Sequence, residues 1–423
     1  MQYQAPTGTQ DILPEDQPYW RYVIARLRHI VERYGFQKID VPMFEDTSLF
    51  ARGVGEATEI VEKEMYTFED RGGRSLTLRP EFTASVMRAY VEHGMHVRPS
   101  PVKLYSIGPI FRYERPQAGR YRQHTQLNVE IVGEQDPAAD LEIMSVAWHI
   151  YADLGFRGLS FQLNSNGCPQ CKPDYTKILR AYYQDHQDTI CDDCKRRLLT
   201  NPLRLLDCKQ PQCQPVMAGA PHITDHLCAG CADHFATLRT YLDDLDRPYV
   251  LNHRLVRGLD YYTKTVFEVW VEGIGAQSSV CGGGRYDGLI ELLGGPPTPA
   301  VGFATGIERI ILTLKNQGIE PLPLPGPQVF LAHLGEAAKR AAIRLLDQLR
   351  QADVGAVMGF GDRSLKAQLR QAGRQGMAYV LVLGEDELAA GQVTVRDMAQ
   401  GRQERVAHDG IVAWLQDHLA AHG

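Results

Sequence analysis

The first regular pattern of apolar residues along the chain predicts a helix at residues 18–35. Gly35 ends the run, and the residues that recur at three- and four-residue steps are Trp20, Val23, Ile24, Leu27, Ile30, Val31 and Tyr34. Residues 37–42 then alternate polar and apolar positions and stop at Pro42, which predicts a strand at the edge or the end of a sheet. The chain therefore opens with an amphipathic helix that leads into a short strand.

A second pattern predicts an antiparallel hairpin. Residues 102–111 are largely apolar, residues 125–132 alternate apolar with polar side chains, and Pro116 and Gly119 force a turn between the two runs. Arginine forks bind phosphate oxygens in pairs and stay charged at neutral pH. The turn is therefore a candidate polyphosphate site, and the alternative is a basic loop exposed to water. The arginines around it are Arg112, Arg115, Arg120 and Arg122.

Residues 167–247 differ in character because they contain eight of the nine cysteines. Helical patterns at 194–199 and 233–244 predict a small, mainly helical insertion. Three of the four cysteine pairs are C-x-x-C, a spacing that offers two thiolates to one metal ion, and Cys208/Cys213 is spaced more loosely. Together the four pairs supply ligands for up to two tetrahedral zinc sites. The alternative is that most of these cysteines are buried apolar residues or remnants of a lost site. The pairs are Cys168/Cys171, Cys191/Cys194, Cys208/Cys213 and Cys228/Cys231.

The proline-rich residues 321–327 predict a stiff linker and a domain boundary. Beyond it, strands are expected at 329–332, 355–358, 379–383 and 392–395, and helices at 336–351 and 364–372, which indicates a mixed sheet with helices on its faces. One face of the second helix is basic, and it is either a solvated surface or a contact for a phosphate backbone. Its residues are Arg363, Lys366, Arg370 and Arg374.

Four segments follow one another along the chain: FRYE at 111–114, RGLDYY at 257–262, SVCGGGRYDG at 279–288 and GFATGIER at 302–309. The first and the last resemble motifs 2 and 3 of class II aminoacyl-tRNA synthetases. The middle two resemble signatures of the histidyl-tRNA synthetase family, and the opening helix and strand resemble motif 1, the dimer interface of the class. An ordered set of motifs is more specific than any one glycine-rich loop.

The resemblance implies an α/β and α+β multidomain protein. Its parts would be an antiparallel-sheet catalytic domain of the class II type at 1–166 and 248–320, the mainly helical insertion at 167–247, the linker at 321–327, and a C-terminal α/β anticodon-binding domain at 328–423. The implied activity is a histidine–tRNA ligase. Its partners would be ATP with Mg²⁺, L-histidine, tRNA(His) and a second copy of the chain in a homodimer.

Residue roles on the nucleotide side follow from the same resemblance. Activation makes a carboxylate attack the α-phosphate of ATP, so cations must meet the developing charge. Arg112 and Arg257 are the implied catalytic residues, and Arg257 takes the place of a metal ion used elsewhere in the class. The remaining implied contacts are Glu114 at the adenine edge, Arg122 and Arg309 at the outer phosphates, Arg120 at the nucleotide generally, and His124 under the adenine ring, where the family usually has an aromatic carbocycle.

Recognition of histidine requires polar partners for both ring nitrogens, because a hydrogen-bonding pocket rejects isosteres better than an apolar one. The resemblance assigns these partners to Glu130 and Tyr262. It places the α-amino group at Glu81, Thr83 and Gln126, the substrate also against Arg112 and Arg257, the walls at Tyr261 and Tyr286, and close backbone approach to the ligand at Gly282, Gly283 and Gly284.

Composition restricts the remaining possibilities. With 423 residues, 44% hydrophobic and 23% charged, the chain has the composition of a soluble multidomain protein. Its net charge of −6 does not suggest a nucleic-acid partner, so any RNA surface must be a local basic patch. No leader-like start or long apolar run is present, which predicts a cytoplasmic protein without membrane contact. Two rival functions are a regulatory subunit of ATP phosphoribosyltransferase and a tRNA-sensing module without catalysis.

Overall fold

A computed structural model of the chain describes residues 3–55, 58–117, 119–272 and 279–420. Its internal contacts divide the chain into two units, Met1–Leu322 and Pro323–Gly423. The division falls inside the proline-rich run at 321–327. No helix in the described ranges has both the length and the apolar character that a membrane span requires.

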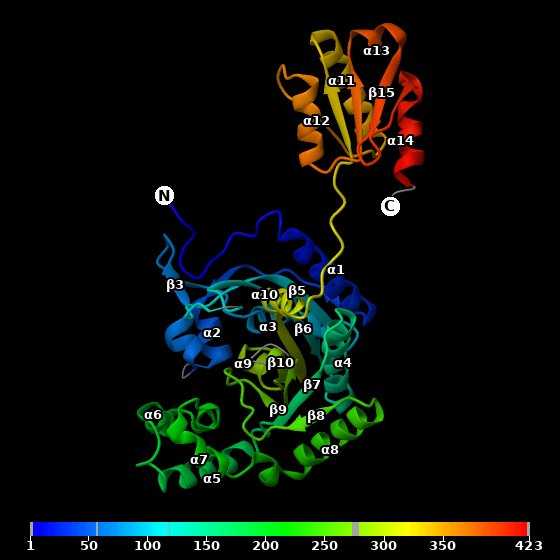
Figure 1. Cartoon of the computed structure of the whole chain (residues 1–423). Coiled ribbons are helices and arrows are strands. Elements are labelled where there is room, and N and C mark those ends of the chain that lie inside the picture. Colours follow the sequence, from blue (N-terminus) through cyan, green and yellow to red (C-terminus); the bar gives the residue numbers. More distant parts are fainter. Residues whose placement is uncertain (1–2, 56–57, 118, 273–278, 421–423) are drawn as a thin grey trace. The chain divides into compact units, whose positions relative to one another are not determined.

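The larger unit is built on an eight-stranded sheet of order β1-β5-β6-β11-β10-β9-β7-β8 (Figure 1). Its six central strands pair antiparallel, and the short edge strands β1 and β8 pair parallel with β5 and β7. The predicted antiparallel catalytic sheet is therefore confirmed. The strands are β1 (Gln37–Lys38), β5 (Val102–Phe111), β6 (Gln123–Val132), β7 (Ser160–Ser165), β8 (Tyr249–Leu251), β9 (Thr263–Trp270), β10 (Ser279–Arg285) and β11 (Ala300–Gly306).

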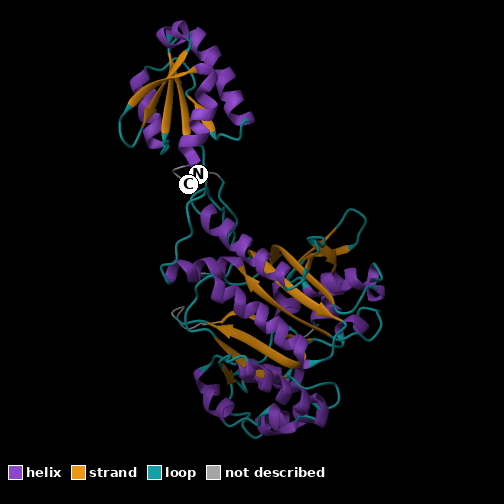
Figure 2. Cartoon of the chain, turned by 90° about the vertical axis from the view of Figure 1, so that its right-hand side faces the viewer, coloured by secondary structure: helices purple, strands orange, loops and turns teal. Residues whose placement is uncertain are grey.

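Helices pack against this sheet and build the main core (Figure 2). They are α1 (Gln17–Arg33), α4 (Pro137–Asp153), α8 (Ala229–Asp244) and α10 (Ile307–Asn316). The predicted apolar face of the first helix is confirmed, since Trp20, Val23 and Leu27 are buried in this core. Along β6, Leu127, Val129 and Ile131 join the same core, so the alternate residues of β6 point to the other face of the sheet.

The other face of β5 and β6 carries a second cluster of buried apolar residues around α3 (Thr83–Glu92) and α9 (Leu289–Leu292). A three-stranded sheet of order β2-β4-β3 also belongs to this unit. Its strands are β2 (Phe44–Asp46), β3 (Tyr66–Glu69) and β4 (Ser75–Leu78), and the nearby helices are α2 (Thr47–Val54), η1 (Ile60–Glu64) and η2 (Met95–Val97).

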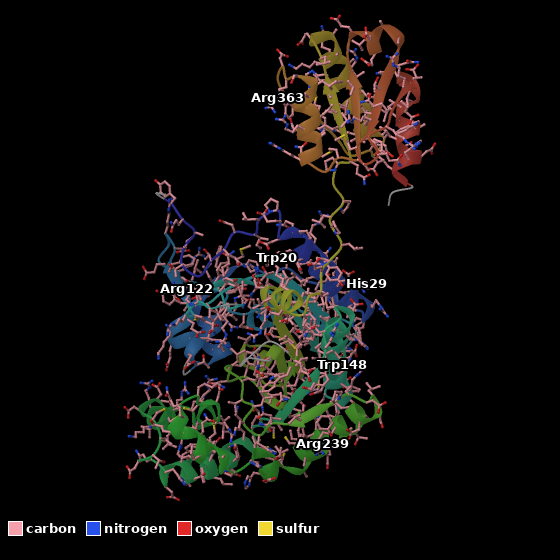
Figure 3. The ribbon with its side chains drawn as sticks, viewed as in Figure 1. Trp20, His29, Arg122, Trp148, Arg239 and Arg363 are labelled. Atoms are coloured by element: carbon pink, nitrogen blue, oxygen red, sulfur yellow. The ribbon has the colours of Figure 1, made fainter. Side chains whose placement is uncertain are left out.

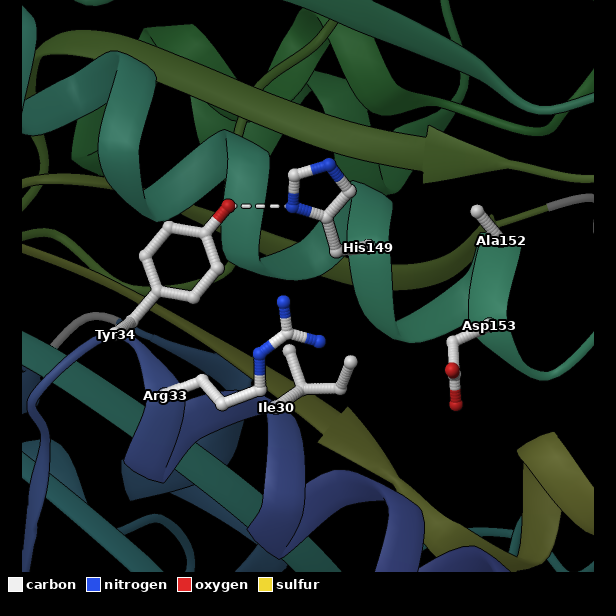
Figure 4. A pocket seen from close by; sticks show the side chains of 6 residues that line it. All are labelled: Ile30, Arg33, Tyr34, His149, Ala152 and Asp153. Carbon is white, nitrogen blue, oxygen red and sulfur yellow. Dashed lines mark hydrogen bonds between the residues drawn. The ribbon is translucent and has the colours of Figure 1, made fainter.

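A cavity of about 360 Å³ lies between α1 and α4. Figure 4 shows the Tyr34 hydroxyl hydrogen-bonded to Nδ1 of His149 across it. Arg26 of α1 also bonds Asp153 of α4, with 2.6 Å between Nε and Oδ2. None of the predicted site residues lines this cavity, so it belongs to the packing of the two helices rather than to the predicted chemistry.

The cysteine-rich segment is mainly helical, as predicted, and has a small core of its own. Its elements are α5 (Lys172–Gln184), α6 (Asp192–Thr200), η3 (Pro202–Asp207), η4 (Pro211–Cys213), α7 (Gln214–Ala218) and η5 (Ile223–His226). The following helix, α8, behaves differently because Phe235, Leu238 and Leu242 are buried in the core of the large sheet. The last helix of the predicted insertion is therefore packed as part of the sheet layer.

The smaller unit has a five-stranded mixed sheet of order β13-β12-β14-β15-β16. The strands are β12 (Val329–His333), β13 (Ala356–Met358), β14 (Tyr379–Leu383), β15 (Gln392–Asp397) and β16 (Gln403–Ala407), and the helices are α11 (Glu336–Gln351), α12 (Leu365–Arg374), α13 (Glu385–Ala390), η6 (His408–Gly410) and α14 (Ile411–Ala420). β12 pairs parallel with β13 and β14, and the other pairs are antiparallel. The mixed sheet is confirmed. The sequence analysis did not predict β16, because its side chains are nearly all exposed and show no apolar pattern.

Candidate active site

One cavity of about 120 Å³ brings together residues from four of the predicted motif segments. It is smaller than the roughly 300–1,000 Å³ of pockets for drug-sized ligands, which suits a single amino acid. All the predicted histidine-binding residues except Glu130 line it. The lining residues are Glu81, Thr83, Arg112, Gln126, Arg257, Leu259, Tyr261, Tyr262, Gly282, Tyr286, Gly302, Phe303 and Ala304.

Acceptor groups lie on one side of the cavity, at the start of α3 and on β6. The Glu81 carboxylate accepts hydrogen bonds from the backbone N–H groups of Thr83 (2.6 Å) and Ala84 (2.8 Å). Burial raises the pKa of Glu81, although these two N–H groups oppose the rise. Oε1 of Gln126 is buried and has no hydrogen-bond partner among the described residues. Together they form a place for a group that donates several hydrogen bonds, such as an ammonium group.

Glu130 lies beside the cavity rather than in its lining. Its carboxylate accepts hydrogen bonds from the hydroxyl of Thr83 (2.6 Å), from the side-chain amide of Asn128 (2.9 Å) and from the hydroxyl of Tyr286. Burial raises the pKa of Glu130 to about 7, and the three donors oppose that rise. Gly302 is required beside it, because a Cβ there would lie 1.6 Å from Oε2 of Glu130.

Three tyrosines form the aromatic wall of the cavity. The ring of Tyr261 lies 4.8 Å from that of Tyr262 and 5.5 Å from that of Tyr286, measured between centroids. Residues 257–262 form the loop between β8 and β9, so the first two rings come from a loop and the third from the end of β10. Burial raises the pKa of Tyr262, so its hydroxyl stays protonated at neutral pH and is able to donate.

Arg257 is held at the cavity by Glu268 of β9. Nη1 of Arg257 lies 2.6 Å from Oε1 of Glu268, whose other oxygen accepts a hydrogen bond from the Trp270 indole at 3.0 Å. A Cβ at position 282 would lie 2.2 Å from Nη1 of Arg257, so only glycine leaves room for the guanidinium. The arginine is therefore fixed before any ligand arrives.

The three consecutive glycines, which were expected to let the backbone approach a ligand, differ in their surroundings. Only Gly282 lines the cavity. A Cβ at Gly283 would lie 2.3 Å from the carbonyl oxygen of Gly302 on β11, and one at Gly284 would lie 2.4 Å from that of Thr265 on β9. These two glycines therefore permit close approach of neighbouring strands of the sheet.

The motif 2 hairpin places charged side chains next to the cavity. β5 and β6 pair from Val102↔Val132 to Phe111↔Gln123, as the sequence predicts. Nε of Arg112 donates to the carbonyl of Pro80 at 2.8 Å. Glu114 lies between two arginines, 3.8 Å from Nη1 of Arg112 and 3.7 Å from Nη1 of Arg120. Because one carboxylate faces two guanidinium groups, the loop keeps an excess of positive charge.

The other predicted nucleotide contacts extend this charged region. Burial lowers the pKa of His124 to about 4, and the charge of Arg112 adds to the effect, so the imidazole is neutral at physiological pH. Burial also lowers the pKa of Arg309, and the charge of Arg120 lowers it further, which places these two cations near each other. The charge of Glu268 opposes this lowering of the Arg309 pKa.

Arg122 and Arg115 are placed differently. The Arg122 guanidinium, whose residue Figure 3 labels, lies 3.8 Å over the ring of Tyr113. Its Nε donates to the carbonyl of Glu114 at 3.1 Å. These contacts hold the turn of the hairpin together. Arg115 is exposed.

Several residues of the site were not singled out from the sequence. Asn128 bonds Glu130 and stands between Gln126 and Glu130 on one face of β6, so the two-residue period of the strand was a usable signal. The strand period could not indicate Glu268 in this way, because its partner Arg257 lies in the loop before β9 and not on the same strand. Glu64 joins Glu114 near the hairpin, where burial and the Glu114 charge raise its pKa.

Arg285, in the segment at 279–288, has a structural rather than a ligand-binding environment. It is fully buried and forms an ion pair with Asp140 of α4, with 3.0 Å between Nε and Oδ2. Its Nη1 also donates to the carbonyl of Glu134 at 2.8 Å. His234 of α8 contacts the same aspartate at 3.3 Å, so β10, α4 and α8 meet at one buried charge cluster.

Two protein-family models match most of this chain. The family model described as Histidyl-tRNA synthetase matches residues 8–169 and 216–310, and the one described as Anticodon binding domain matches 328–418. The Histidine–tRNA ligase of Dehalococcoides mccartyi is 54% identical over 417 residues, covering 99% of this chain and 100% of that protein. The corresponding protein of Pelotomaculum thermopropionicum is 51% identical over 414 residues, covering 98% and 97%. This chain belongs to the histidyl-tRNA synthetase family.

Solved structures agree with membership of the histidyl-tRNA synthetase family. The crystal structure of apo S. aureus histidyl-tRNA synthetase has a TM-score of 0.82 at 39% identity, covering 97% of this chain and 99% of that one. A Bacillus halodurans protein described as an ATP phosphoribosyltransferase regulatory subunit/histidyl-tRNA synthetase has a TM-score of 0.62 at 20% identity, which shows a shared fold alone. The family and the class II fold predicted from the sequence are confirmed. The histidyl family model leaves out residues 170–215, the greater part of the cysteine-rich segment.

Proposed function

We propose that this chain is a histidine–tRNA ligase, which activates L-histidine with ATP and transfers the histidyl group to the 3′-terminal adenosine of tRNA(His). Similarity along nearly the whole chain to curated ligases supports this function. The observation that carries it is the cavity lined by Glu81, Gln126 and three tyrosines together with Arg112 and Arg257. It provides separate places for the ammonium group, the ring and the carboxylate of one amino acid.

In the first step, a carboxylate oxygen of histidine bonds to the α-phosphorus of ATP, and the bond from that phosphorus to the bridging oxygen breaks to release pyrophosphate. The attacking carboxylate is already ionised, so no protein base is needed. The reacting groups are both anionic, and fixed cations lower the barrier by stabilising the charge that develops between them. We assign this role to Arg112 and Arg257, which line the cavity together.

The ammonium group and the imidazole ring of histidine are assigned separate partners in the cavity. The α-ammonium group would donate to Glu81, to the Thr83 hydroxyl and to the buried, unpartnered Oε1 of Gln126. Glu130 and the hydroxyl of Tyr262 would bond the two ring nitrogens. An ionised carboxylate has about four acceptor positions, and three donors occupy Glu130, so one position remains for an imidazole N–H.

ATP would lie along the motif 2 hairpin. Arg122 and Arg309 are assigned to the outer phosphates, Arg120 to the nucleotide generally, Glu114 to the adenine edge, and the neutral imidazole of His124 to stacking under the ring. Mg²⁺ is expected to arrive with the phosphates, since this ion is bound largely through phosphates and water. The described side chains assigned to the phosphates are arginines, which cannot ligate a cation, so no residue here is assigned to the metal.

The smaller unit is assigned to the anticodon region of tRNA(His), because it matches the family of anticodon-binding domains. The basic face on α12 would contact the phosphate backbone. α1 and β1 are assigned to a homodimer interface, by their likeness to motif 1. A ligase that charges tRNA for protein synthesis works beside the ribosome, so we assign it to the cytoplasm.

Pyrophosphate exchange tests the function. Wild-type chain incubated with labelled pyrophosphate, Mg²⁺ and ATP should form labelled ATP only when L-histidine is present. It should then charge tRNA(His) with histidine. A regulatory subunit or a tRNA-sensing module would show neither reaction, and exchange supported equally by other amino acids would refute the assignment of the pocket.

A further inference from the structure

The eight cysteines of residues 167–247 assemble into two groups of four. The proximal cluster consists of Cys168, Cys171, Cys228 and Cys231, and the distal cluster consists of Cys191, Cys194, Cys208 and Cys213. In each group all four sulfur atoms lie within 4.8 Å of one another. Each joins two pairs that are distant in sequence, so the path of the chain, and not the local spacing, decides which pairs combine.

The spacing of the sulfur atoms is that of a zinc-centred tetrahedron. With Zn–S bonds of about 2.3 Å, the edge between two sulfurs is about 3.8 Å. A disulfide would require about 2.05 Å, and all eight cysteines are free. The observed edges are 3.8 Å for Cys168–Cys171, 3.7 Å for Cys168–Cys228, 3.8 Å for Cys171–Cys231, 3.8 Å for Cys191–Cys208 and 3.9 Å for Cys194–Cys213.

Backbone N–H groups also point at the sulfurs. The N–H of Cys168 lies 3.3 Å from Sγ of Cys171, and that of Cys191 lies 3.2 Å from Sγ of Cys213. Hydrogen bonds of this kind fix the ligands of metal sites and stabilise thiolates. An all-cysteine tetrahedral set suits Zn²⁺ and not the hard cations Mg²⁺ or Ca²⁺. Buried cysteines that merely fill space would not need this arrangement twice.

Residues next to the cysteines of the proximal cluster are hydrogen-bonded to the segment that carries Tyr262. The N–H of Lys264 donates to the carbonyl of Gly167 at 2.6 Å, and the N–H of Asn166 donates to the carbonyl of Lys264 at 2.7 Å. Nζ of Lys172 donates to the carbonyl of Tyr262 at 3.4 Å. The residues that flank Cys168 and Cys171 thus hold the backbone on both sides of residue 263.

The distal cluster contacts the catalytic part less directly. Between Cys194 and Cys208, Arg197 pairs with Glu59 at 2.6 Å, and Nδ2 of Asn201 donates to Oδ1 of Asp260 at 2.8 Å. The backbone of Asp260 is held independently, because its N–H donates to the carbonyl of Val54 at 3.0 Å. Loss of the distal cluster would therefore leave this part of the pocket loop in place.

We propose that both clusters bind structural Zn²⁺, and that the proximal ion positions the histidine-binding loop whereas the distal ion holds only the insertion. Ligand sets of four thiolates leave no open coordination position, so neither ion takes part in the reaction. The insertion has a small core, and metal ions stabilise segments of that kind. The proximal role rests on the proposed function, while the presence of zinc does not.

Metal content tests the first part. The full chain, purified without a histidine tag, should contain about two zinc ions, and the Cys168→Ser/Cys171→Ser and Cys191→Ser/Cys194→Ser variants about one each. Chain produced with Co²⁺ should show the intense absorption of tetrahedral cobalt thiolates, which needs no variant to fold. A folded wild-type chain without zinc, or without that absorption, would overturn the proposal.

Kinetics test the second part, with the two double variants as matched controls for each other. In histidine-dependent exchange, the proximal variant should raise the KM for histidine about tenfold or more while the KM for ATP changes little, because only the histidine loop moves. The distal variant should change neither KM more than about twofold, by the same reasoning. Equal effects of the two variants would refute the different roles.

Lys172→Met decides the outcome if the proximal double variant does not fold. It keeps all eight ligands and removes the bond to the Tyr262 carbonyl, so it should retain two zinc ions and still raise the KM for histidine. An unchanged KM would refute the positioning role. A wild-type chain that holds zinc but shows no histidine-dependent exchange would refute the proposed function and leave the zinc sites standing.

Discussion

Replacement of Arg257 by histidine should slow histidine activation at least about a hundredfold while the fold and histidine binding remain. Removal of one preorganised charge-stabilising donor costs about 10²–10³ in rate, or about 2.7–4 kcal/mol of transition-state stabilisation. Arg257 fits that description because Glu268 holds it at 2.6 Å before the ligand binds. Imidazole is shorter and largely neutral above pH 7, so the variant loses the cation.

Two further variants separate the charge of Arg257 from its placement. Gly282→Ala keeps Arg257 but adds a Cβ that would lie 2.2 Å from its Nη1. The guanidinium should therefore be displaced, and the activation rate should fall nearly as far as in Arg257→His. Glu268→Gln keeps an acceptor for Arg257 without the charge and should cost less, about tenfold. The ordering of the three rates follows from the geometry of the pocket alone.

The assay is histidine-dependent pyrophosphate exchange, with the adenylation rate measured in single turnovers and histidine affinity measured separately by calorimetry. A rate for Arg257→His within about threefold of wild type would show that this arginine does not stabilise the transition state. A Gly282→Ala variant with the wild-type rate would show that the observed position of Arg257 is not the reactive one.

Four other outcomes are expected. Glu130→Gln and Tyr262→Phe should raise the KM for histidine more than that for ATP, since each removes a partner of a ring nitrogen, and a change in the ATP requirement alone would refute the assignment. Because burial raises the pKa of Glu130 to about 7, its carboxylate ionises as the pH rises from about 6 to 8. Over that range the KM for histidine should fall more steeply in wild type than in Glu130→Gln, and parallel pH profiles would contradict this. Charge reversal of Arg370 and Arg374 should weaken tRNA charging and its salt dependence while exchange stays intact, and unchanged tRNA affinity at two salt concentrations would leave that face a solvated surface. Arg285→Leu should destabilise the chain by about 3–5 kcal/mol in urea unfolding, because it removes the buried guanidinium partner of Asp140, whose other contact is His234, and a shift below about 1 kcal/mol would refute a structural role.

The prediction for the basic face already has a structural basis. The side chains of Arg363, Lys366, Arg370 and Arg374 are all exposed, and Figure 3 labels Arg363 near the start of α12. Ser364 begins that helix, since its hydroxyl accepts from the N–H of Ala367 at 3.4 Å. Lys366, Arg370 and Arg374 therefore lie on one exposed face of α12, whereas Arg363 precedes Ser364 and lies outside the helix.

The sequence by itself determined the local elements and the family. The buried stripe of α1, the β5–β6 hairpin and the bounds of α11 followed from apolar periodicity, because a helix or strand with one buried face repeats its apolar residues at its own period. The family followed from ordered motifs. Gln126 and Glu130 were assigned to the histidine pocket from the resemblance to the family, and both lie on β6.

Only the tertiary structure decided which distant residues meet. Arg257 and Glu268 are separated by a loop and a strand, and Glu130 takes its hydrogen bonds from Thr83 and Tyr286, which lie 47 and 156 residues away. Gly283 is required by a carbonyl of β11, and no local pattern reveals that. The four cysteine pairs allowed several combinations, and the path from β7 to α8 selected one. Local sequence reports the preferences of a short backbone segment, whereas such contacts depend on how the whole chain packs.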